Sequence, residues 1–279
     1  MSLLWEPRSL RVTWPDNCRV AVWIVVNIEY FIFGRPGPSL QSHLATGLDI
    51  ANYDWRRYGD RAGIWRLLDL MDELSIPVTA AINGEICVKQ PEVMDAIGRR
   101  GWQIIGHGLD NSTPHYEIAP EAELARITRT VELLQGTSGQ EVKGWLTPGF
   151  SISENTFDLL CKAGLVYTAD LVGSDRPGWL DLSSGRLLSI PYSLETNDIS
   201  HFISQKSTPQ QFADAVVDHI EQLAAEPPGA VTGIGLHPFI VGQPGRIKYL
   251  RSCLQRLREL SGVWLTTGDQ IYKYVRGVS

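Results

Sequence analysis

Three side chains capable of acid–base chemistry follow short apolar runs in the sequence. Glu29 ends RVAVWIVVNIE, His107 stands between two glycines in IIGHG, and His237 follows AVTGIGL. A carboxylate that accepts a proton and an imidazole that gives one up supply the two roles of general acid–base catalysis. We therefore take these three as candidate catalytic residues, with Glu29, or His107 through a water molecule, activating a nucleophile and His237 protonating a leaving group.

Each of these residues also has a structural explanation. A carboxylate at the end of a strand often only hydrogen-bonds to neighbouring amides, and a histidine before a proline can hydrogen-bond across the end of a sheet. The glycines beside His107 are unusual for a packed histidine, because they let a backbone or a ligand approach closely.

A metal site is incomplete at the same stretch. Asn111 stands four residues after His107, where a second imidazole would complete a metal site. An amide oxygen is a poor zinc ligand beside imidazole, and Glu29 with His107 would supply two protein ligands where a catalytic zinc has three and a water. We expect no cofactor; the alternative is a weakly held divalent metal such as zinc on Glu29 and His107.

Other catalytic patterns are incomplete as well. GFSIS (149–153) lacks the closing glycine of a nucleophile elbow, and GIG (233–235) lacks the third glycine of a dinucleotide-binding loop. The four cysteines lie far apart and form no Cys-x-x-Cys pair, so neither a zinc knuckle nor a disulfide framework is indicated.

Short β-branched runs alternate with amphipathic segments along the chain. The runs predict strands at residues 19–29, 78–83, 103–108, 143–149, 166–172, 187–193, 230–238 and 263–268. Helical periodicity predicts helices at residues 60–75, 91–101, 120–136, 154–163, 208–225, 246–260 and 269–276. This alternation favours an α/β fold with about seven or eight parallel strands, closed as a barrel or open and doubly wound. Since no Gly/Ser/Pro linker divides the chain, we expect a single domain over residues 1–279.

Functional side chains of a parallel barrel lie where the strands end. Residues at the predicted strand ends should therefore converge on one face; they are Asn27, Glu29, His107, Thr147, Pro148, Asp170 and His237. The segment at about residues 30–59 is far longer than a usual connection and is rich in Gly, Pro and aromatic residues. We predict that it is a lid or an oligomer contact.

The composition limits the partners. The net charge is −6, 43% of the residues are hydrophobic, and no block of Lys or Arg occurs. Nucleic acid or an anionic membrane would call for a basic patch, so we expect neither partner and a small-molecule substrate instead. The N-terminus lacks a basic start followed by an apolar stretch, and nothing later reaches the length of a membrane span, which predicts a cytoplasmic protein. We also expect a homo-oligomer, with the aromatic-rich early segment as its interface.

Six motifs in a fixed order connect the chain to a known family. They are NIE, YGDRAGIWRLLDLMDEL, IIGHG, GWLTPGFS, SDRPGW and GLHPFIVGQPGR. With them the chain resembles the polysaccharide deacetylase (NodB-homology) superfamily, and within it the branch of allantoinase-like and cyclic-imidase-like proteins. The resemblance spans nearly the whole chain. It implies a distorted (β/α) barrel and hydrolysis of a carbon–nitrogen amide or imide bond other than a peptide bond.

The chain departs from the pattern that this resemblance implies. Deacetylases of the family use an Asp–Asp pair, one as base and one as metal ligand, together with His-x-x-x-His. Here Asn27 and Glu29 stand at the pair, Asn111 replaces the second histidine, and Leu146 precedes TP where the family has an arginine. Because an amide cannot take a proton, the role of the base at Asn27 is vacant or has passed to Glu29. These losses fit a metal-independent hydrolase of a small amide, cyclic imide or ureide. The alternatives are a metal-dependent deacetylase of N-acetylated sugars and a non-catalytic barrel that binds a ligand.

A wider set of residues is expected to bind the substrate. It comprises Asn27, Asn111, Thr147, Pro148, Asp175, Trp179 and Asp198. In SDRPGW, Asp175 would orient a catalytic histidine and Trp179 would wall the pocket, although a turn with a packed tryptophan explains both as simply. Asp198 in ETNDIS could likewise either contribute to the site or have only a structural role. The remaining histidines, His43, His115, His201 and His219, are expected in loops or at the surface.

Overall fold

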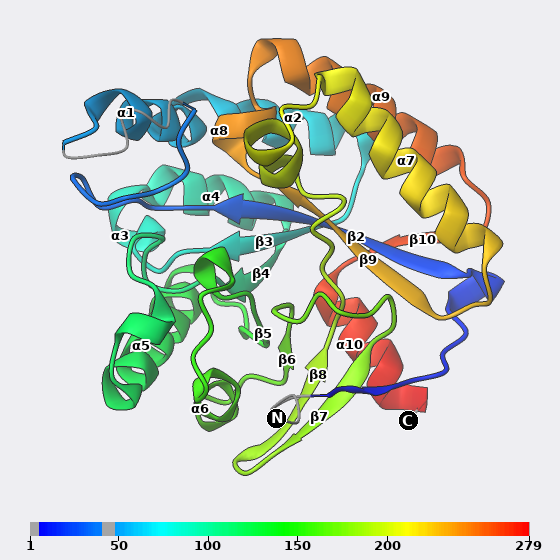
Figure 1. Ribbon diagram of the computed structural model, residues 1–279, viewed down its shortest axis with the longest axis horizontal. Helices are drawn as coiled ribbons and strands as arrows, with labels where there is room; N and C mark the ends of the chain where they lie inside the picture. The colour runs from blue at the N-terminus through cyan, green and yellow to red at the C-terminus, as the bar shows by residue number, and fades with distance from the viewer. Residues whose placement is uncertain (1–5, 41–47, 279) are drawn as a thin grey trace.

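The structure is a computed structural model that describes residues 6–40 and 48–278. Its strands form one mixed sheet with the order β1-β7-β8-β6-β5-β4-β3-β2-β10, and β9 pairs with β2 (Figure 1). The strands are β1 Arg8–Ser9, β2 Val20–Ile28, β3 Val78–Ile82, β4 Gln103–Gly106, β5 Gly144–Trp145, β6 Tyr167–Thr168, β7 Gly178–Leu182, β8 Gly185–Ser189, β9 Ala230–Leu236 and β10 Val263–Thr266. Every pairing is parallel except β1 with β7 and β7 with β8.

The long central strand β2 organises the sheet. It pairs with β9 along one edge, and along the other with β10 at its start and β3 at its end. All nine of its residues are buried, which suits a parallel strand covered on both faces. The continuous apolar run in the sequence therefore becomes the strand that carries Asn27 and leads into Glu29.

The sheet closes through the segment that follows β8. Asn197 forms a parallel bridge with Gly235 of β9, and Thr196 Oγ1 donates to Gly233 O at 2.6 Å. The predicted distorted (β/α) barrel is confirmed, with an irregular segment in place of a regular strand between β8 and β9.

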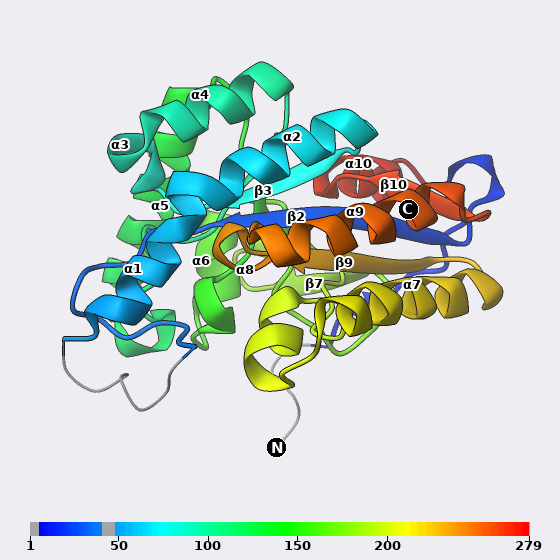
Figure 2. The same cartoon turned by 90° about the horizontal axis from the view of Figure 1, so that it is seen from above.

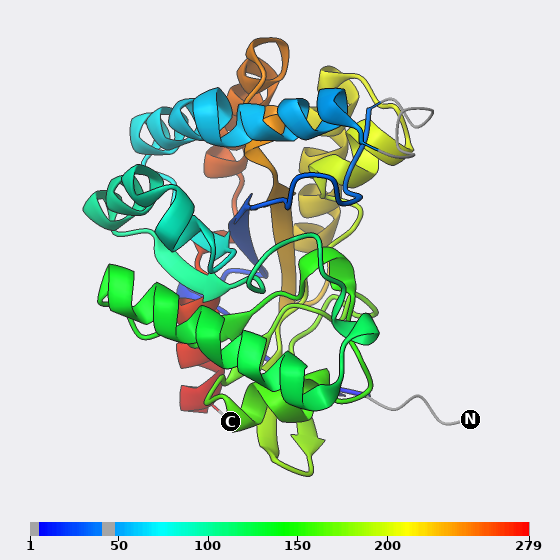
Figure 3. The ribbon, with the colours of Figure 1, turned by 90° about the vertical axis from the view of Figure 1, so that its left-hand side faces the viewer.

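Helices surround the strands, as Figure 3 shows for α2, α4, α5 and α7. The helices are α1 Ile50–Tyr58, α2 Ile64–Leu74, α3 Ile86–Lys89, α4 Pro91–Arg100, α5 Pro120–Ser138, α6 Thr156–Lys162, α7 Pro209–Ala225, α8 Pro238–Val241, α9 Pro244–Glu259 and α10 Gly268–Val278. A π-helical turn, Gly59–Gly63, joins α1 to α2. Figure 2 shows α2, α7, α8 and α9 lying over β2 and β9. No described helix is long and apolar enough to cross a membrane.

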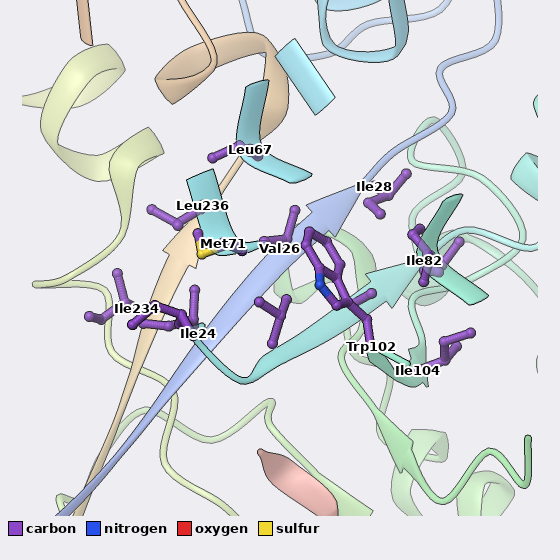
Figure 4. Packing of buried hydrophobic residues seen from close by; sticks show 14 of the residues in the cluster. Ile24, Val26, Ile28, Leu67, Met71, Ile82, Trp102, Ile104, Ile234 and Leu236 are labelled. Atoms are coloured by element: carbon purple, nitrogen blue, oxygen red, sulfur yellow. The ribbon is translucent and has the colours of Figure 1, made fainter. Parts of the chain in front are cut away.

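The outer face of the barrel packs against these helices. Helix α2 buries Leu67, Leu70, Met71 and Leu74, a spacing that gives one apolar face on a 3.6-residue period. Figure 4 shows Leu67 and Met71 of this helix near β2 and β9. The two strands contribute to the same hydrophobic cluster the side chains of Ile24, Val26, Ile28, Ile234 and Leu236.

The inside of the barrel is also filled. Trp23, Tyr167 and Leu188 belong to an inner cluster that includes Ile271 and Val275 of α10. Helix α10 is held at the starts of the strands, since Gly268 N donates to Thr79 Oγ1 at 3.1 Å and Asp269 Oδ1 accepts from Gln103 Nε2 at 3.2 Å. The amino-terminal end of the barrel is therefore plugged.

Several local predictions were wrong. The sequence analysis did not predict strands β1 and β7 or helices α1, α3 and α8. Helix α1 lies in the segment at about 30–59 that was expected to be a loop. Residues 41–47 of that segment, which include His43, lie outside the described residues. His115 and His201 are buried, at 1% and 6% exposure, whereas we expected loop or surface positions. Each ring has a polar partner: His115 Nδ1 lies 3.1 Å from Glu123 Oε1, and His201 Nε2 lies 2.9 Å from Glu195 O.

Candidate active site

The carboxyl ends of the strands surround one pocket of about 430 Å³, which we call the main pocket. Glu29 follows β2, His107 follows β4 and His237 follows β9, so the predicted convergence is confirmed. Register accounts for these positions: Ile28 pairs with Ile82 and Ile82 with Gly106, which puts Glu29 and His107 at one level. Val26 pairs with Leu236, which puts His237 level with Asn27. The lining is Asn27, Glu29, Pro38, His107, Asn111, Thr113, Pro114, Tyr116, Leu146, Thr147, Pro148, Gly149, Phe150, Ser151, Tyr192, Leu194, Asn197, Ile199, Ser200 and His237.

Three side chains lie close to one oxygen of Glu29. Asn111 Nδ2 donates to Glu29 Oε1 at 2.6 Å, while His107 Nε2 and His237 Nε2 lie 3.4 and 3.6 Å from the same oxygen. The Glu29 side chain is 3% exposed. A buried carboxylate held this way is fixed in position beside two imidazoles.

The tautomer of His107 follows from its partners. Its Nδ1 lies 2.6 Å from Leu146 O, which can only accept a hydrogen bond, so Nδ1 carries a hydrogen. Its Nε2 faces Glu29 and the main pocket.

His237 is paired with a buried aspartate. Its Nδ1 lies 2.6 Å from Asp198 Oδ1, and its backbone N–H donates to Asp198 Oδ2 at 2.7 Å. Burial favours the neutral ring, but the charges of Asp198 and Glu29 and the hydrogen bond to Asp198 outweigh it and raise the pKa of His237 above its usual value. The arrangement favours an imidazolium whose Nε2–H faces Glu29, a form suited to a general acid.

A chain of hydrogen bonds fixes the orientation of Asn111. Asn83 Oδ1 accepts from Tyr30 N at 2.7 Å, and Asn83 Nδ2 donates to His107 O, so the amide of Asn83 can stand only one way round. Its Nδ2 also donates to Asn111 Oδ1 at 3.3 Å. Asn111 must therefore turn its Nδ2 toward Glu29.

Comparison with known proteins finds similarity to the polysaccharide deacetylases and to an allantoinase. Residues 55–168 match the family model described as Polysaccharide deacetylase. A Schizosaccharomyces pombe protein named as a polysaccharide deacetylase is 27% identical over 293 residues, which cover 92% of this chain and 90% of that protein. The solved structure of the PuuE allantoinase is 25% identical with a TM-score of 0.84, and the alignment covers 94% of this chain and 91% of that one. A solved Mycobacterium smegmatis protein, named as a polysaccharide deacetylase, is also 25% identical with a TM-score of 0.84, and the alignment covers 98% of this chain and 95% of that one. Part of the chain, residues 55–168, thus matches the polysaccharide deacetylase family, and the fold of nearly the whole chain is similar to that of the two solved proteins.

The metal site that this family implies does not fit the residues present. At the position of the second metal histidine, Asn111 presents an amide N–H₂, a donor group that holds Glu29 Oε1 and offers a cation no lone pair. Its oxygen faces Asn83 instead. Over residues 6–40 and 48–278, no group of three or more His, Cys, Asp and Glu side chains is placed to hold a metal ion.

Tyr192 is a pocket residue that the sequence analysis missed. Asn27 Nδ2 and Asn197 Nδ2 donate to its hydroxyl oxygen at 3.2 and 3.0 Å, so both lone pairs are engaged and the hydroxyl hydrogen is left to donate. Burial raises the pKa of Tyr192 and keeps it protonated. A Cβ on Gly235 would meet the Tyr192 hydroxyl at 2.0 Å, so the glycine is what lets the ring lie against β9.

Thr147 and Pro148 line the main pocket as predicted, on a turn that Asp170 holds from outside the pocket. Asp170 accepts from Thr147 N at 2.6 Å and from Thr147 Oγ1 at 2.9 Å. Burial raises the pKa of Asp170, and its threonine hydrogen bonds oppose that rise. Asp170, at the end of its strand, supports the pocket wall and does not line it.

Three residues predicted to bind substrate lie elsewhere. Asp198 is fully buried behind His237 and orients that ring. The backbone of Asp175 bonds to Val231, near the start of β9 and six residues before His237, which is about 20 Å along a strand. Trp179 lies on β7 at the plugged end, against Tyr272 of α10. SDRPGW is therefore a structural turn and strand, and the aspartate that orients a histidine is Asp198.

Proposed function

We propose that this chain hydrolyses a carbon–nitrogen bond of a small neutral amide, cyclic imide or ureide without a bound metal. The observation that carries the proposal is the placement of Glu29 between two imidazoles, with Asn111 donating to it where the family has a metal ligand. A fixed carboxylate beside an imidazolium supplies a base and an acid within one pocket.

The chemistry follows from the positions of the groups. Glu29 takes a proton from a water molecule, and the resulting hydroxide attacks the carbonyl carbon. The Tyr192 hydroxyl donates to the oxygen that becomes negative. His237, protonated and held by Asp198, gives its Nε2 proton to the nitrogen as the carbon–nitrogen bond breaks. His107, whose Nε2 lies 3.4 Å from Glu29 Oε1, orients the attacking water.

The pocket lining supports a neutral substrate. None of the described residues around the main pocket is lysine or arginine, and Glu29 is the only carboxylate among them. A substrate bearing a carboxylate or phosphate would find no cation there, and it would meet Glu29. Hydroxyl and amide groups, with the apolar sides of Tyr116, Phe150 and Leu194, suit an uncharged polar ring.

The test compares substrates and metal states. Protein treated with a chelator should turn over a cyclic ureide, a cyclic imide or a simple amide, and added zinc should not increase the rate. Glu29→Gln should lower this turnover by about 10²–10⁴-fold. Activity confined to N-acetylglucosamine oligomers and dependent on added metal would instead support the metal-dependent deacetylase, a candidate favoured by the name of the S. pombe relative. Ligand binding without turnover would support a non-catalytic barrel.

A further inference from the structure

A second, much smaller cavity adjoins Glu29. It has a volume of about 10 Å³ and lies between the end of β2, the α1–α2 region, α4 and α8. Its lining is Asn27, Ile28, Glu29, Arg56, Gly59, Asp60, Ile64, Gln90, Val93, Pro238 and Phe239. We call it the side cavity. A space of this size holds about one water molecule.

Unpartnered polar atoms gather at the side cavity. Within the described part of the chain, five buried side-chain nitrogen or oxygen atoms have no hydrogen-bond partner, and three of them belong to residues that line it. The three atoms are Glu29 Oε2, Arg56 Nε and Gln90 Oε1. Arg56 and Gln90 are each 4% exposed, so bulk solvent does not satisfy them. Buried polar groups without partners are costly, and their clustering around one space calls for a common partner.

The other contacts of these residues leave these atoms for the cavity. Gln90 Nε2 donates to Asp60 Oδ2 at 2.7 Å, which turns Gln90 Oε1 away from that carboxylate. Arg56 Nη1 donates to Pro38 O at 2.9 Å, and the guanidinium lies 4.9 Å from the centre of the Phe31 ring. Glu29 uses Oε1 for Asn111, so Oε2 is its remaining acceptor.

We propose that the side cavity binds one water molecule that links Arg56 to Glu29. The water would accept from Arg56 Nε–H and donate to Glu29 Oε2 and Gln90 Oε1, which matches one donor and two acceptors to the hydrogen-bonding capacity of water. A cation is disfavoured by the Arg56 charge, and an anion by Glu29 and the Gln90 oxygen. Water is therefore the ligand that satisfies all three atoms.

The bound water makes Arg56 a positioning residue for the base. Arg56 lines the side cavity and not the main pocket, so it acts on Glu29 through the water and does not touch substrate. With Oε2 held from one side and Oε1 held by Asn111, the carboxylate cannot rotate. This consequence for the rate rests on the proposed function, whereas the water site itself does not.

The first experiment is structural and needs no substrate. A crystal structure at about 1.2 Å resolution should show one ordered water within hydrogen-bond distance of Glu29 Oε2, Arg56 Nε and Gln90 Oε1. Gln90→Met, which keeps the length of the side chain and removes its oxygen, should lose that water or reduce its occupancy. A direct Arg56–Glu29 hydrogen bond, or a site without a water in the parent protein, would overturn the proposal.

The second experiment is kinetic. Arg56→Met should lower kcat by about 10–100-fold with little change in KM, the range expected for one hydrogen bond to a charged group. Arg56→Lys, which keeps the charge, should recover part of that loss. Arg61→Gln is the matched control: this exposed arginine pairs with Asp54 and should leave the rate unchanged. Melting temperatures of all variants separate a folding defect from a catalytic one.

The outcomes separate the two proposals. If Glu29→Gln is inactive but folded Arg56→Met retains the parent kcat, the positioning role is wrong and the proposed function stands. If Glu29→Gln stays active while the crystal shows the water, the site is right and the assignment of the base is wrong.

Discussion

The pairing of Asp198 with His237 gives the sharpest test of the site, through Asp198→Asn. Asp198 accepts from two donors, Nδ1–H and the backbone N–H of His237. An asparagine can offer an oxygen to only one of them. If its oxygen takes the backbone N–H, its N–H₂ faces Nδ1 and opposes the imidazolium; if it turns round, the N–H₂ faces the backbone donor.

The size of the effect follows from these contacts. The variant loses a hydrogen bond between charged groups, worth about 1.5–3 kcal/mol, and gains a buried donor without a partner, which costs about 1–3 kcal/mol. The imidazolium is therefore destabilised by about 2.5–6 kcal/mol, or about 10²–10⁴-fold in kcat/KM at neutral pH.

The pH dependence has a definite sign. His237 acts as an acid only when protonated, so activity falls as the pH rises through its pKa, which the protein holds above the usual value. Removing the Asp198 charge lowers that pKa, and the alkaline limb of the kcat/KM profile should move to lower pH.

The control is Asp175→Asn, at an exposed aspartate in SDRPGW. It should leave both the rate and the profile unchanged, and melting temperatures should show that both variants fold. Parent-like kinetics in a folded Asp198→Asn protein would refute the assignment of His237 as the acid. Loss of activity in Asp175→Asn instead would restore the sequence-based interpretation.

Three further variants or measurements test the remaining groups. Glu29→Gln keeps the shape and most hydrogen bonds of the carboxylate but cannot take a proton, so turnover should fall by about 10²–10⁴-fold with an unchanged melting temperature; near-parent activity would make His107 the next base to test. Tyr192→Phe should lower kcat by about 10–100-fold because one donor to the developing oxyanion is lost, and an effect confined to KM would show that the hydroxyl only binds the ground state. Elemental analysis should find well under one zinc per chain after dialysis, while Asn111→His should raise the zinc content by supplying an imidazole in place of an amide donor; one zinc retained by the parent protein would contradict metal independence.

The sequence predicted the parts of the site that depend on strand ends. Glu29, His107 and His237 each follow an apolar strand, and parallel strands bring such ends together whatever the loops do. The resemblance to the family showed that Asn27 and Asn111 stand where the family has an aspartate and a metal-binding histidine. The helical bounds of the outer layer were close to the predictions for the same reason, since 3.6-residue periodicity is a local signal.

What the sequence did not predict depends on irregular backbone. Asp175 lies just before the short strand β7, and Asp198 lies in the irregular segment after β8. Only the closure of the barrel by residues 196–197 against β9 brings Asp198 to His237. Tyr192 lies in the same closing segment. Arg56 belongs to a helix inside a segment that lacked any clear periodic signal, so its approach to Glu29 could not be inferred from spacing.

The two asparagines of the site are best understood together. In the family pattern, an aspartate and a second histidine stand at these positions, one taking a proton and one holding a metal. Here Asn27 and Asn111 are both donors: the first holds the Tyr192 hydroxyl oxygen, and the second holds Glu29 Oε1. Each side chain now orients a neighbour that can do chemistry itself. Replacing only one of them would not rebuild the family's site: a histidine at position 111 would remove the Asn111 donor to Glu29, and a charged aspartate at position 27 would repel Glu29. Under the proposed function the two asparagines take the place of the metal site, which is why we expect Asn111→His to gain zinc without gaining the family's full deacetylase activity.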